Sequence, residues 1–428
     1  MTRRALALLL APLLLVALGA ASGAVLVPGV VLFGVVALVI LIDSRSAPGP
    51  DLVDVERSCD RLFSVGAANP VTLRVHAPAA ALLVIRDDAP IEMLASAQLH
   101  TIRGDGELQY TLTPHARGDA QFGGVHVRAT GPWNLGTRDF VVAQSQTVRV
   151  DADISAVRVY EALARRGQLE ELGVRTLRRH GNGTEFERVR EAVPEDPLRH
   201  INWRATARTG RLMATEMAVE RDQPVIACID HGRLMGVGAG PLTKLDHAIN
   251  AALLLLHVAL RTGDRAGLVA FADRVTAVVE PRSGSTQLRR LLDAIGPLHA
   301  GEIESDYARA LTEVRTHQRR RALIAVFTDV VDGDQAAALI AQCRLLRRRH
   351  LPLVITVRDP AVEDIARARP GDAAAVYARA IAAGIAADRA QALRLLEAAG
   401  IDVIDADART LSPRLVNRYL ELKRRAAL

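Results

Sequence analysis

Two aspartates in the C-terminal half of the chain stand where a ligand site is most easily built. Asp230 closes the short apolar run Val225–Asp230, and Asp329 closes the run Ala322–Asp329. Runs of this kind predict buried strands of a parallel sheet. Ligands of such sheets bind at the carboxyl ends of the strands, so the two carboxylates are candidates for one shared site.

The sequence offers few other groups for chemistry. It contains no Ser-His-Asp arrangement, no HExxH motif and no Walker loop. His231 follows Asp230, but no His/Cys pair at ligand spacing accompanies it, so we expect it to face solvent rather than bind zinc. The glycines near 181–183 lack the Lys-Ser/Thr pair of a phosphate loop. The three cysteines include no CxxC pair, which excludes a disulfide scaffold and a cysteine-rich zinc module.

The two aspartates need a sheet to position them, and strands alternate with helices after residue 223. The expected strands are Val225–Asp230, Ala266–Phe271, Thr276–Glu280, Ala322–Asp329, Leu353–Val357 and Ile401–Ile404. The expected helices are Thr243–Leu260, Thr286–Ile295, Asp306–His317, Gln335–Arg348, Ala378–Ala399 and Pro413–Arg425. This alternation predicts an α/β fold with a doubly wound, mostly parallel sheet.

The N-terminus carries an uncharged apolar stretch from Ala5 to Ile42. Its length and the break near Gly19 predict a hairpin of two spans, about Ala5–Gly19 and Ala24–Ile42. Arginines flank the stretch on both sides, which places both ends in the cytoplasm. The alternative is a cleaved signal peptide, in which the second span anchors a body of reversed orientation.

The remaining segments complete a four-part organisation. Alternating runs separated by turn residues predict a small β-sandwich. Its strands are expected at Val71–His76, Ala81–Arg86, Leu108–Thr113, Gly124–Arg128, Phe140–Val142 and Val148–Val150. The predicted parts are two transmembrane helices (1–44), the β-sandwich (45–150), a charged connector (151–222) and the α/β domain (223–428).

Three segments of the α/β domain resemble a von Willebrand factor A domain. Those domains begin a metal site with Asp-x-Ser-x-Ser after the first strand, and add a Thr before a middle helix and an Asp after a later strand. The corresponding segments here read Asp230-His-Gly-Arg-Leu-Met235, Glu304-Ser-Asp-Tyr-Ala-Arg-Ala-Leu311 and Phe327-Thr-Asp329. The resemblance implies an A-like domain.

The same resemblance implies a degenerate site for Mg²⁺ or Mn²⁺, held by Asp230, Ser305 and Asp329. Gly232 and Leu234 replace the two serines of the usual motif. Their loss removes two hydroxyl ligands and lowers the expected affinity for a hard cation. In the alternative interpretation, the two aspartates cap the amino ends of neighbouring helices.

The connector is similar to the signature of the bacterial family called domain of unknown function 58. The pattern is Gly-x-Glu-Phe-x-x-x-Arg followed by Asp-x-x-Arg-x-Ile-x-Trp-x-Ala-x-Ala-Arg. The matching residues are Gly183, Glu185, Phe186, Arg190, Asp196, Arg199, Ile201, Trp203, Ala205, Ala207 and Arg208. That family has the same layout along nearly the whole chain, and its members often accompany MoxR-type AAA+ ATPases. The resemblance implies a membrane-tethered adaptor or assembly factor with no established reaction.

The signature is a candidate docking surface for such an ATPase. The residues expected to bind the partner are Glu185, Arg190, Asp196, Arg199, Trp203 and Arg208. Asp196 and Arg199 are close enough in sequence to pair on one helical turn. We expect this segment and the Asp230/Asp329 face to form one surface. The alternative is a connector whose ion pairs only fasten the flanking domains.

Two function classes follow, an interaction protein and a metal-dependent hydrolase using Asp230 and Asp329. A hydrolase needs a general base and a formed pocket, for which the sequence gives no sign. We therefore expect a non-enzymatic adaptor of the bacterial inner membrane, multi-pass, with its main body in the cytoplasm. Its partners are a MoxR-type ATPase and other membrane proteins, and no small-molecule substrate is identified.

The composition also bears on nucleic-acid binding. A net charge of +6 and 3% aromatic residues, without a recognition motif, predict that the protein binds no specific nucleic acid.

Overall fold

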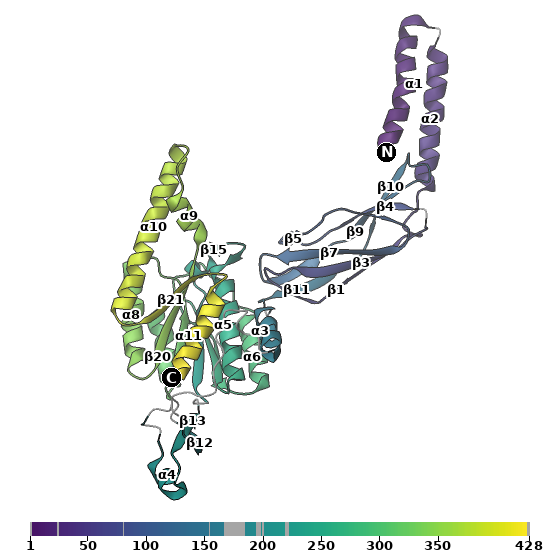
Figure 1. Cartoon of the computed structure of the whole chain (residues 1–428). Coiled ribbons are helices and arrows are strands. Elements are labelled where there is room, and N and C mark those ends of the chain that lie inside the picture. Colours follow the sequence, from purple (N-terminus) through teal and green to yellow (C-terminus); the bar gives the residue numbers. More distant parts are fainter. Residues whose placement is uncertain are drawn as a thin grey trace. The chain divides into compact units, whose positions relative to one another are not determined.

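The described part of the chain forms two compact units, Met1–Asp151 and Ala152–Leu428. The computed structural model describes residues 2–23, 25–79, 81–153, 155–166, 185–193, 198, 201–218 and 222–425. The architecture is mixed α/β, with two apolar helices ahead of several sheets (Figure 1). Each unit is described by itself below.

The first unit begins with two antiparallel apolar helices, α1 (Arg3–Ser22) and α2 (Leu26–Ser46). Both are long and apolar enough to cross a membrane, judged by length and composition. Helix α1 extends beyond its predicted span at both ends, whereas α2 begins two residues later than predicted and ends four residues later. The Thr2 side chain accepts a hydrogen bond from the Ala5 amide and caps α1, so helix begins at Arg3. At its other end, α2 continues through Asp43 to Ser46.

Three antiparallel-rich sheets follow the helices. The strands are β1 (Asp54–Cys59), β2 (Leu62–Ser64), β3 (Asn69–His76), β4 (Leu82–Asp87), β5 (Met93–Ala95), β6 (His100–Arg103), β7 (Gly106–Pro114), β8 (Gly118–Phe122), β9 (Val125–Thr130), β10 (Thr137–Val142) and β11 (Gln146–Asp151). Their orders are β1-β3-β7-β5, β10-β9-β4-β6 and β2-β11-β8. The six predicted runs correspond to β3, β4, β7, β9, β10 and β11.

The two four-stranded sheets bury facing side chains. Along β3 every second residue is buried, as expected when one face of a strand packs on a core. An interior ion pair joins Arg57 on β1 to Asp87 on β4, with side chains 1% and 3% exposed. Tyr110 on β7 also donates to Asp87, at 2.5 Å. Because these contacts cross from one sheet to the other, the unit is a small sandwich with a polar link in its core.

The second unit is built on a six-stranded sheet of order β18-β17-β14-β19-β20-β21. Its strands are β14 (Pro224–Asp230), β17 (Arg265–Phe271), β18 (Val275–Arg282), β19 (Leu323–Phe327), β20 (Leu351–Arg358) and β21 (Asp402–Asp407), with a small ribbon of β15 (Gly238–Ala239) and β16 (Leu242–Thr243). Only β18, at one edge, runs antiparallel to its neighbour in this sheet. All seven residues of β14 are buried, as expected for a central strand covered on both faces.

Helices cover both faces of this sheet, as the sequence predicted for a doubly wound fold. The helices on one face are α3 (Ser155–Arg166), α5 (Lys244–Arg261), α6 (Ser285–Ile295) and α11 (Leu411–Arg424). Those on the other are α7 (Tyr307–His317), α8 (Gly333–Arg347) and α10 (Ala373–Ala398). A helix that the sequence analysis missed, α9 (Pro360–Arg367), contacts α10.

The signature segment forms an antiparallel ribbon of β12 (Glu185–Glu191) and β13 (Met213–Ala218), with α4 (Trp203–Thr209) between the two strands. Trp203 and Arg208 therefore lie on one short helix. The segment rejoins the main sheet at Asp222, which pairs with Arg265 at the start of β17 and with Arg320 ahead of β19. The ribbon thus enters the sheet at the amino end of β14.

Candidate functional site

The predicted aspartates meet at the switch point of the main sheet. β14 and β19 are neighbours, and the chain leaves β14 toward β17 on the other side. At such a point the connections that follow the two strands run to opposite sides of the sheet. The side chains at the two carboxyl ends therefore lie next to each other. Asp230 is the last residue of β14, as predicted, whereas β19 ends at Phe327 and Asp329 lies two residues beyond it.

Asp230 is buried, with 2% of its surface exposed. It accepts hydrogen bonds from the Gly232 amide at 2.8 Å, the Ser305 hydroxyl at 2.5 Å and the Thr328 hydroxyl at 2.6 Å. Burial penalises the charged carboxylate more than these bonds favour it, so the pKa of Asp230 is raised. The structure therefore brings Ser305 to Asp230, as the sequence predicted, and adds Thr328.

Gly232 is explained by the position of Ser305. A Cβ atom on residue 232 would lie 2.1 Å from the Ser305 hydroxyl oxygen and 2.8 Å from the Ile303 carbonyl oxygen. The backbone of Gly232, with φ −70°, is open to any residue, so space and not conformation demands glycine. Ser305 thus fills the volume that a side chain at position 232 would need.

Asp329 is held by cations from two helices. Its exposed fraction is 1%. Lys244, the first residue of α5, places its ammonium nitrogen 2.5 Å from one carboxylate oxygen, and Arg389 of α10 pairs with the other. Arg389 also binds Asp405 of β21 at 2.9 Å, which extends the ion-pair network across the sheet. The sequence analysis missed both cations, because nothing in their local sequence marks them.

The side chains, as they lie, do not fit the Mg²⁺ or Mn²⁺ site predicted at Asp230, Ser305 and Asp329. Hard cations need several free oxygen ligands. Both oxygens of Asp329 already bind positive side chains, and both oxygens of Asp230 accept hydrogen bonds. No group of three or more His, Cys, Asp or Glu side chains in the described residues is placed to hold a metal. A divalent ion would have to displace the Lys244 ammonium from Asp329.

The helix-capping alternative for the two aspartates is wrong. The neighbouring helices have caps of their own: the side chain of Asp306 caps α7, that of Asp332 caps α8 and that of Thr243 caps α5. Asp230 and Asp329 instead bind amides in the turns that directly follow them.

The cavity beside Asp230 is small. A cavity of about 20 Å³ lies against Asp230, Ser305 and Tyr307, which is room for a single water molecule. The Tyr307 hydroxyl lies 2.9 Å from that of Thr328, and burial raises the pKa of Tyr307. His231 does not simply face solvent as predicted, since its Nε2 lies 2.9 Å from the Thr276 hydroxyl. The arrangement is a closed polar cluster and not a substrate pocket.

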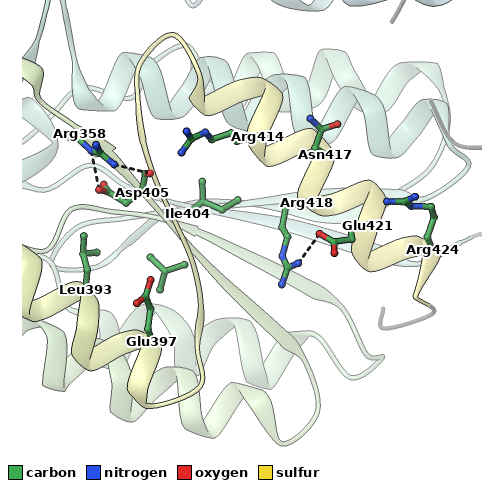
Figure 2. A pocket seen from close by; sticks show the side chains of 11 residues that line it. Arg358, Leu393, Glu397, Ile404, Asp405, Arg414, Asn417, Arg418, Glu421 and Arg424 are labelled. Carbon is green, nitrogen blue, oxygen red and sulfur yellow. Dashed lines mark hydrogen bonds and ion pairs between the residues drawn. The ribbon is translucent and has the colours of Figure 1, made fainter. Parts of the chain in front are cut away.

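A larger cleft of about 690 Å³ lies apart from this cluster, along the edge strand β21 (Figure 2). Side chains from β21, α10 and α11 line it. Its charges are mostly matched inside the cleft: Arg358 lies 3.2 Å from Asp405, and Arg418 lies 2.8 Å from Glu421. These pairs balance most of the charge, so the cleft has no strong preference for an ion of either sign.

Four of the six predicted docking residues are described, and all four lie in the signature ribbon. Glu185 begins β12, and Arg190 on the same strand donates to the Glu191 carbonyl at 3.0 Å. Trp203 and Arg208 lie on α4, whose residues are all outside the core. The other two predicted docking residues, Asp196 and Arg199, lie outside the described residues.

The end of this ribbon, residues 198 and 201–212, is here called the signature tip. Its large apolar side chains are exposed: Leu198 by 78%, Trp203 by 65% and Leu212 by 50%. The backbone beneath them is nevertheless fixed, because Asn202 caps α4 and the Thr206 hydroxyl accepts the Met213 amide at 3.0 Å.

The signature tip and the Asp230 cluster do not form one surface. Figure 1 shows α4 beyond the end of the sheet at which β14 begins, and β15 beyond the opposite end. Asp222 lies two residues ahead of β14 and Asp230 is its last residue, so the whole seven-residue strand lies between them, which spans about 20 Å from its first to its last residue at 3.3 Å per residue. The expected continuous docking face is therefore replaced by two separate features.

Comparison with known proteins finds a matching family for the middle of the chain. Residues 188–371 match the sequence model of the family described as "Protein of unknown function DUF58". This part of the chain is therefore similar to the family that the signature residues predicted.

Curated relatives share the same region. Uncharacterized protein Rv1480 of Mycobacterium tuberculosis and uncharacterized protein Mb1516 of Mycobacterium bovis are each 25% identical to this chain over 182 residues. The match covers 42% of this chain and 56% of each relative, so the chain spans about half the length of the curated relatives it matches.

Solved structures give weaker likenesses. Proximal thread matrix protein 1 from the mussel byssus, with a zinc occupied MIDAS motif, has a TM-score of 0.30 at 12% identity and covers 48% of this chain and 47% of that chain. The Escherichia coli chaperone DraB has a TM-score of 0.17 at 10% identity and covers 23% of this chain and 56% of that chain. Scores this low carry no inference about function.

Proposed function

We propose that this protein is a membrane-anchored adaptor whose C-terminal von Willebrand A-like unit presents the signature tip to a MoxR-type AAA+ ATPase. In this role it acts in the assembly or maturation of other membrane proteins. The two apolar helices supply the anchor. The order of the six-stranded sheet and the polar residues at its switch point support the A-like assignment. The ATPase as partner comes from the family resemblance.

The exposed tryptophan of the signature tip carries the proposal. Trp203 and Leu198 leave most of their surface to solvent on a segment whose backbone is held by side-chain hydrogen bonds. Exposed apolar groups on a fixed frame are typical of protein-binding surfaces. Arg208 is exposed on the same helix. Tryptophan and arginine are also the residues that most often dominate binding energy at interfaces.

The hydrolase hypothesis gains no support from the site. Its two proposed carboxylates are engaged inside the protein, Asp329 by Lys244 and Arg389 and Asp230 by two hydroxyl groups. A general base must be free to take a proton from a bound reactant. The adjoining cavity has a volume of only about 20 Å³, too small for a substrate beside a nucleophilic water.

Two exposed tryptophans make a matched test of ATPase binding. Trp203→Ala should weaken binding of the full-length protein to the purified ATPase by about tenfold or more, as for an interface anchor. Trp133→Ala removes a tryptophan that is 57% exposed on the other unit, and should leave binding unchanged. Affinity would be measured in detergent micelles by biolayer interferometry.

Charge reversal at Arg208 gives an independent variant. Arg208→Glu should also reduce binding while the melting temperature stays unchanged, because no residue of α4 is buried. Full binding by both Trp203→Ala and Arg208→Glu would show that the signature tip is not the docking surface. A large fall in melting temperature would instead favour a role in fastening the fold.

A further inference from the structure

The loop at residues 131–136, here called the latch loop, lies at the ends of both apolar helices. The Thr2 hydroxyl, ahead of α1, donates to the Asn134 carbonyl at 2.7 Å, and the Thr2 amide donates to the Leu135 carbonyl at 3.1 Å. Asp43, in the last turns of α2, contacts the same loop. The strands of the first unit, residues 54–151, are here called the β unit. One short loop of the β unit therefore contacts both the start of α1 and the end of α2.

Asp43 is a fixed point of this arrangement. It is fully buried, and its carboxylate accepts backbone hydrogen bonds from Trp133 at 2.8 Å, Leu135 at 2.8 Å and Gly136 at 2.7 Å. A carboxylate satisfied by three amides is stable in a buried place, whereas an unpaired one is not. The latch loop is folded around this side chain.

Two glycines make the close approach possible. A Cβ atom on Gly131 would lie 2.3 Å from the Asp43 carbonyl oxygen, and one on Gly136 would lie 2.3 Å from the Ser44 amide nitrogen. Any larger residue would push the loop away from α2. The helices and the β unit are therefore joined here by a sterically close-fitting contact and not only by the linker after Ser46.

This contact fixes the depth of Trp133. The loop touches both helices at their ends, so it lies at the level where a membrane-spanning pair would leave the hydrocarbon core. Trp133 is 57% exposed at that level. Tryptophan prefers the boundary between hydrocarbon and water, where its ring is partly apolar and its N–H remains solvated. Three exposed arginines lie at the same helix ends: Arg3, Arg4 and Arg45.

We infer that the latch loop holds Trp133 in the phospholipid headgroup layer, so that the β unit is locked against the membrane surface and does not swing on a free linker. The arginines would add attraction to anionic headgroups. This inference rests on the proposed membrane anchor, and it adds a lipid-contacting residue and a rigid joint to it.

The chain contains two tryptophans, so each can be observed alone. Full-length protein would be reconstituted into vesicles of zwitterionic and anionic phospholipids, brominated either near the headgroup or near the chain ends. In Trp203→Phe, the remaining Trp133 should be quenched most by bromine near the headgroup. In Trp133→Phe, the remaining Trp203 should not be quenched. Equal quenching of the two tryptophans, or none for Trp133, would overturn the inference.

The joint has its own variants. Asp43→Ala removes the acceptor of three amides, and Gly136→Ala inserts a Cβ atom against α2. Each should lower the headgroup quenching of Trp133 and shift its emission to longer wavelength. Unchanged quenching in both variants would show that the latch does not position Trp133.

Extraction at alkaline pH separates this inference from the proposed anchor. If carbonate releases the protein from the vesicles, the anchor itself fails, and with it both proposals. If the protein stays in the bilayer and Trp133 is not quenched, only the placement of the loop is wrong.

Discussion

At the scale of single residues, the Asp230 cluster depends on a fit between Gly232 and Ser305. The Ser305 hydroxyl binds Asp230 in the space that a side chain on residue 232 would occupy. The two positions are therefore coupled, so that a substitution at one should change the effect of a substitution at the other. The space beside Asp230 at position 232 is thus filled by a side chain from another loop.

Gly232→Ser should destabilise the protein, because the added atoms overlap Ser305 and Ile303. We expect a loss of about 1–3 kcal/mol in the free energy of unfolding, the usual cost of overpacking. Ser305→Ala should cost less, and the double variant should recover part of the loss from Gly232→Ser. Urea unfolding of the four proteins would measure the coupling. Strict additivity would contradict the fit described here.

The Lys244–Asp329 pair should stabilise the fold without metal. Lys244→Met leaves Asp329 buried with Arg389 alone, so we expect a loss of about 1–3 kcal/mol, below the 3–5 kcal/mol of a fully orphaned charge. Arg282→Ala, in an exposed pair with Glu280, should change little.

Excess Mg²⁺ or Mn²⁺ tests the predicted metal site directly. We expect no rise in the melting temperature of the wild-type protein, because cations of the protein already occupy Asp329. A metal-dependent rise that Asp230→Ala abolishes would show that the ion displaces Lys244 and that the site binds metal after all.

These residues also show which parts of the site could be predicted from the sequence and which could not. Asp230 and Asp329 could be predicted to converge because strand-end acids gather at one edge of a parallel sheet. Lys244 and Arg389 could not, since they reach Asp329 from helices 85 and 60 residues away in sequence. Those contacts, and not the acids themselves, decide whether the site is open to a cation.

At the scale of elements, most long periodic segments were predictable and most short ones were not, although the 12-residue helix α3 was also missed. The central strands and α5 carry continuous apolar patterns that only a buried element explains. The three-residue strands β2 and β5 carry too little pattern to be seen. Helix α9 has only eight residues, none of them buried, and is shorter than the window over which a helical apolar pattern can be recognised.

The contact of α3 with α5 should weaken in mild acid. His257 of α5 is 4% exposed and packs edge-on against Tyr160 of α3, with ring centroids 6.1 Å apart. Burial lowers the pKa of His257 below its ordinary value of 6.5, and neighbouring Glu161 opposes this only in part.

The direction of the pH effect follows from that pKa. As the pH falls below about 6.5, the unfolded chain binds a proton at residue 257 that the folded protein resists, so stability is lost until the lower, folded pKa is passed. His257→Gln should flatten this loss, by at most about 1.4 kcal/mol per pH unit. His317→Gln, on the surface of α7, is the control. Urea unfolding at several pH values would decide, and an identical pH slope in wild type and His257→Gln would contradict the assignment.

At the scale of the whole molecule, the placement of charge predicts on which side of a membrane the two units would lie. Arg3 and Arg4 open α1, Arg45 lies in the last turn of α2, and the turn between the helices carries no charge. Loops rich in arginine stay in the cytoplasm, so both units should lie there. The signal-peptide alternative removes the first helix and reverses the body.

Reporter fusions distinguish the two orientations. An enzyme active only in the periplasm, fused after Leu428, should be silent, whereas a reporter that folds only in the cytoplasm should be active at the same position. The periplasmic enzyme inserted at Gly23, in the turn between the helices, should be active and serves as the matched control. Replacing Arg3 and Arg4 with neutral residues should weaken this preference, because they supply the positive charge at the start of the first helix. Strong periplasmic activity after Leu428 in the wild-type chain would exclude the hairpin, and it would also exclude docking to a cytoplasmic ATPase.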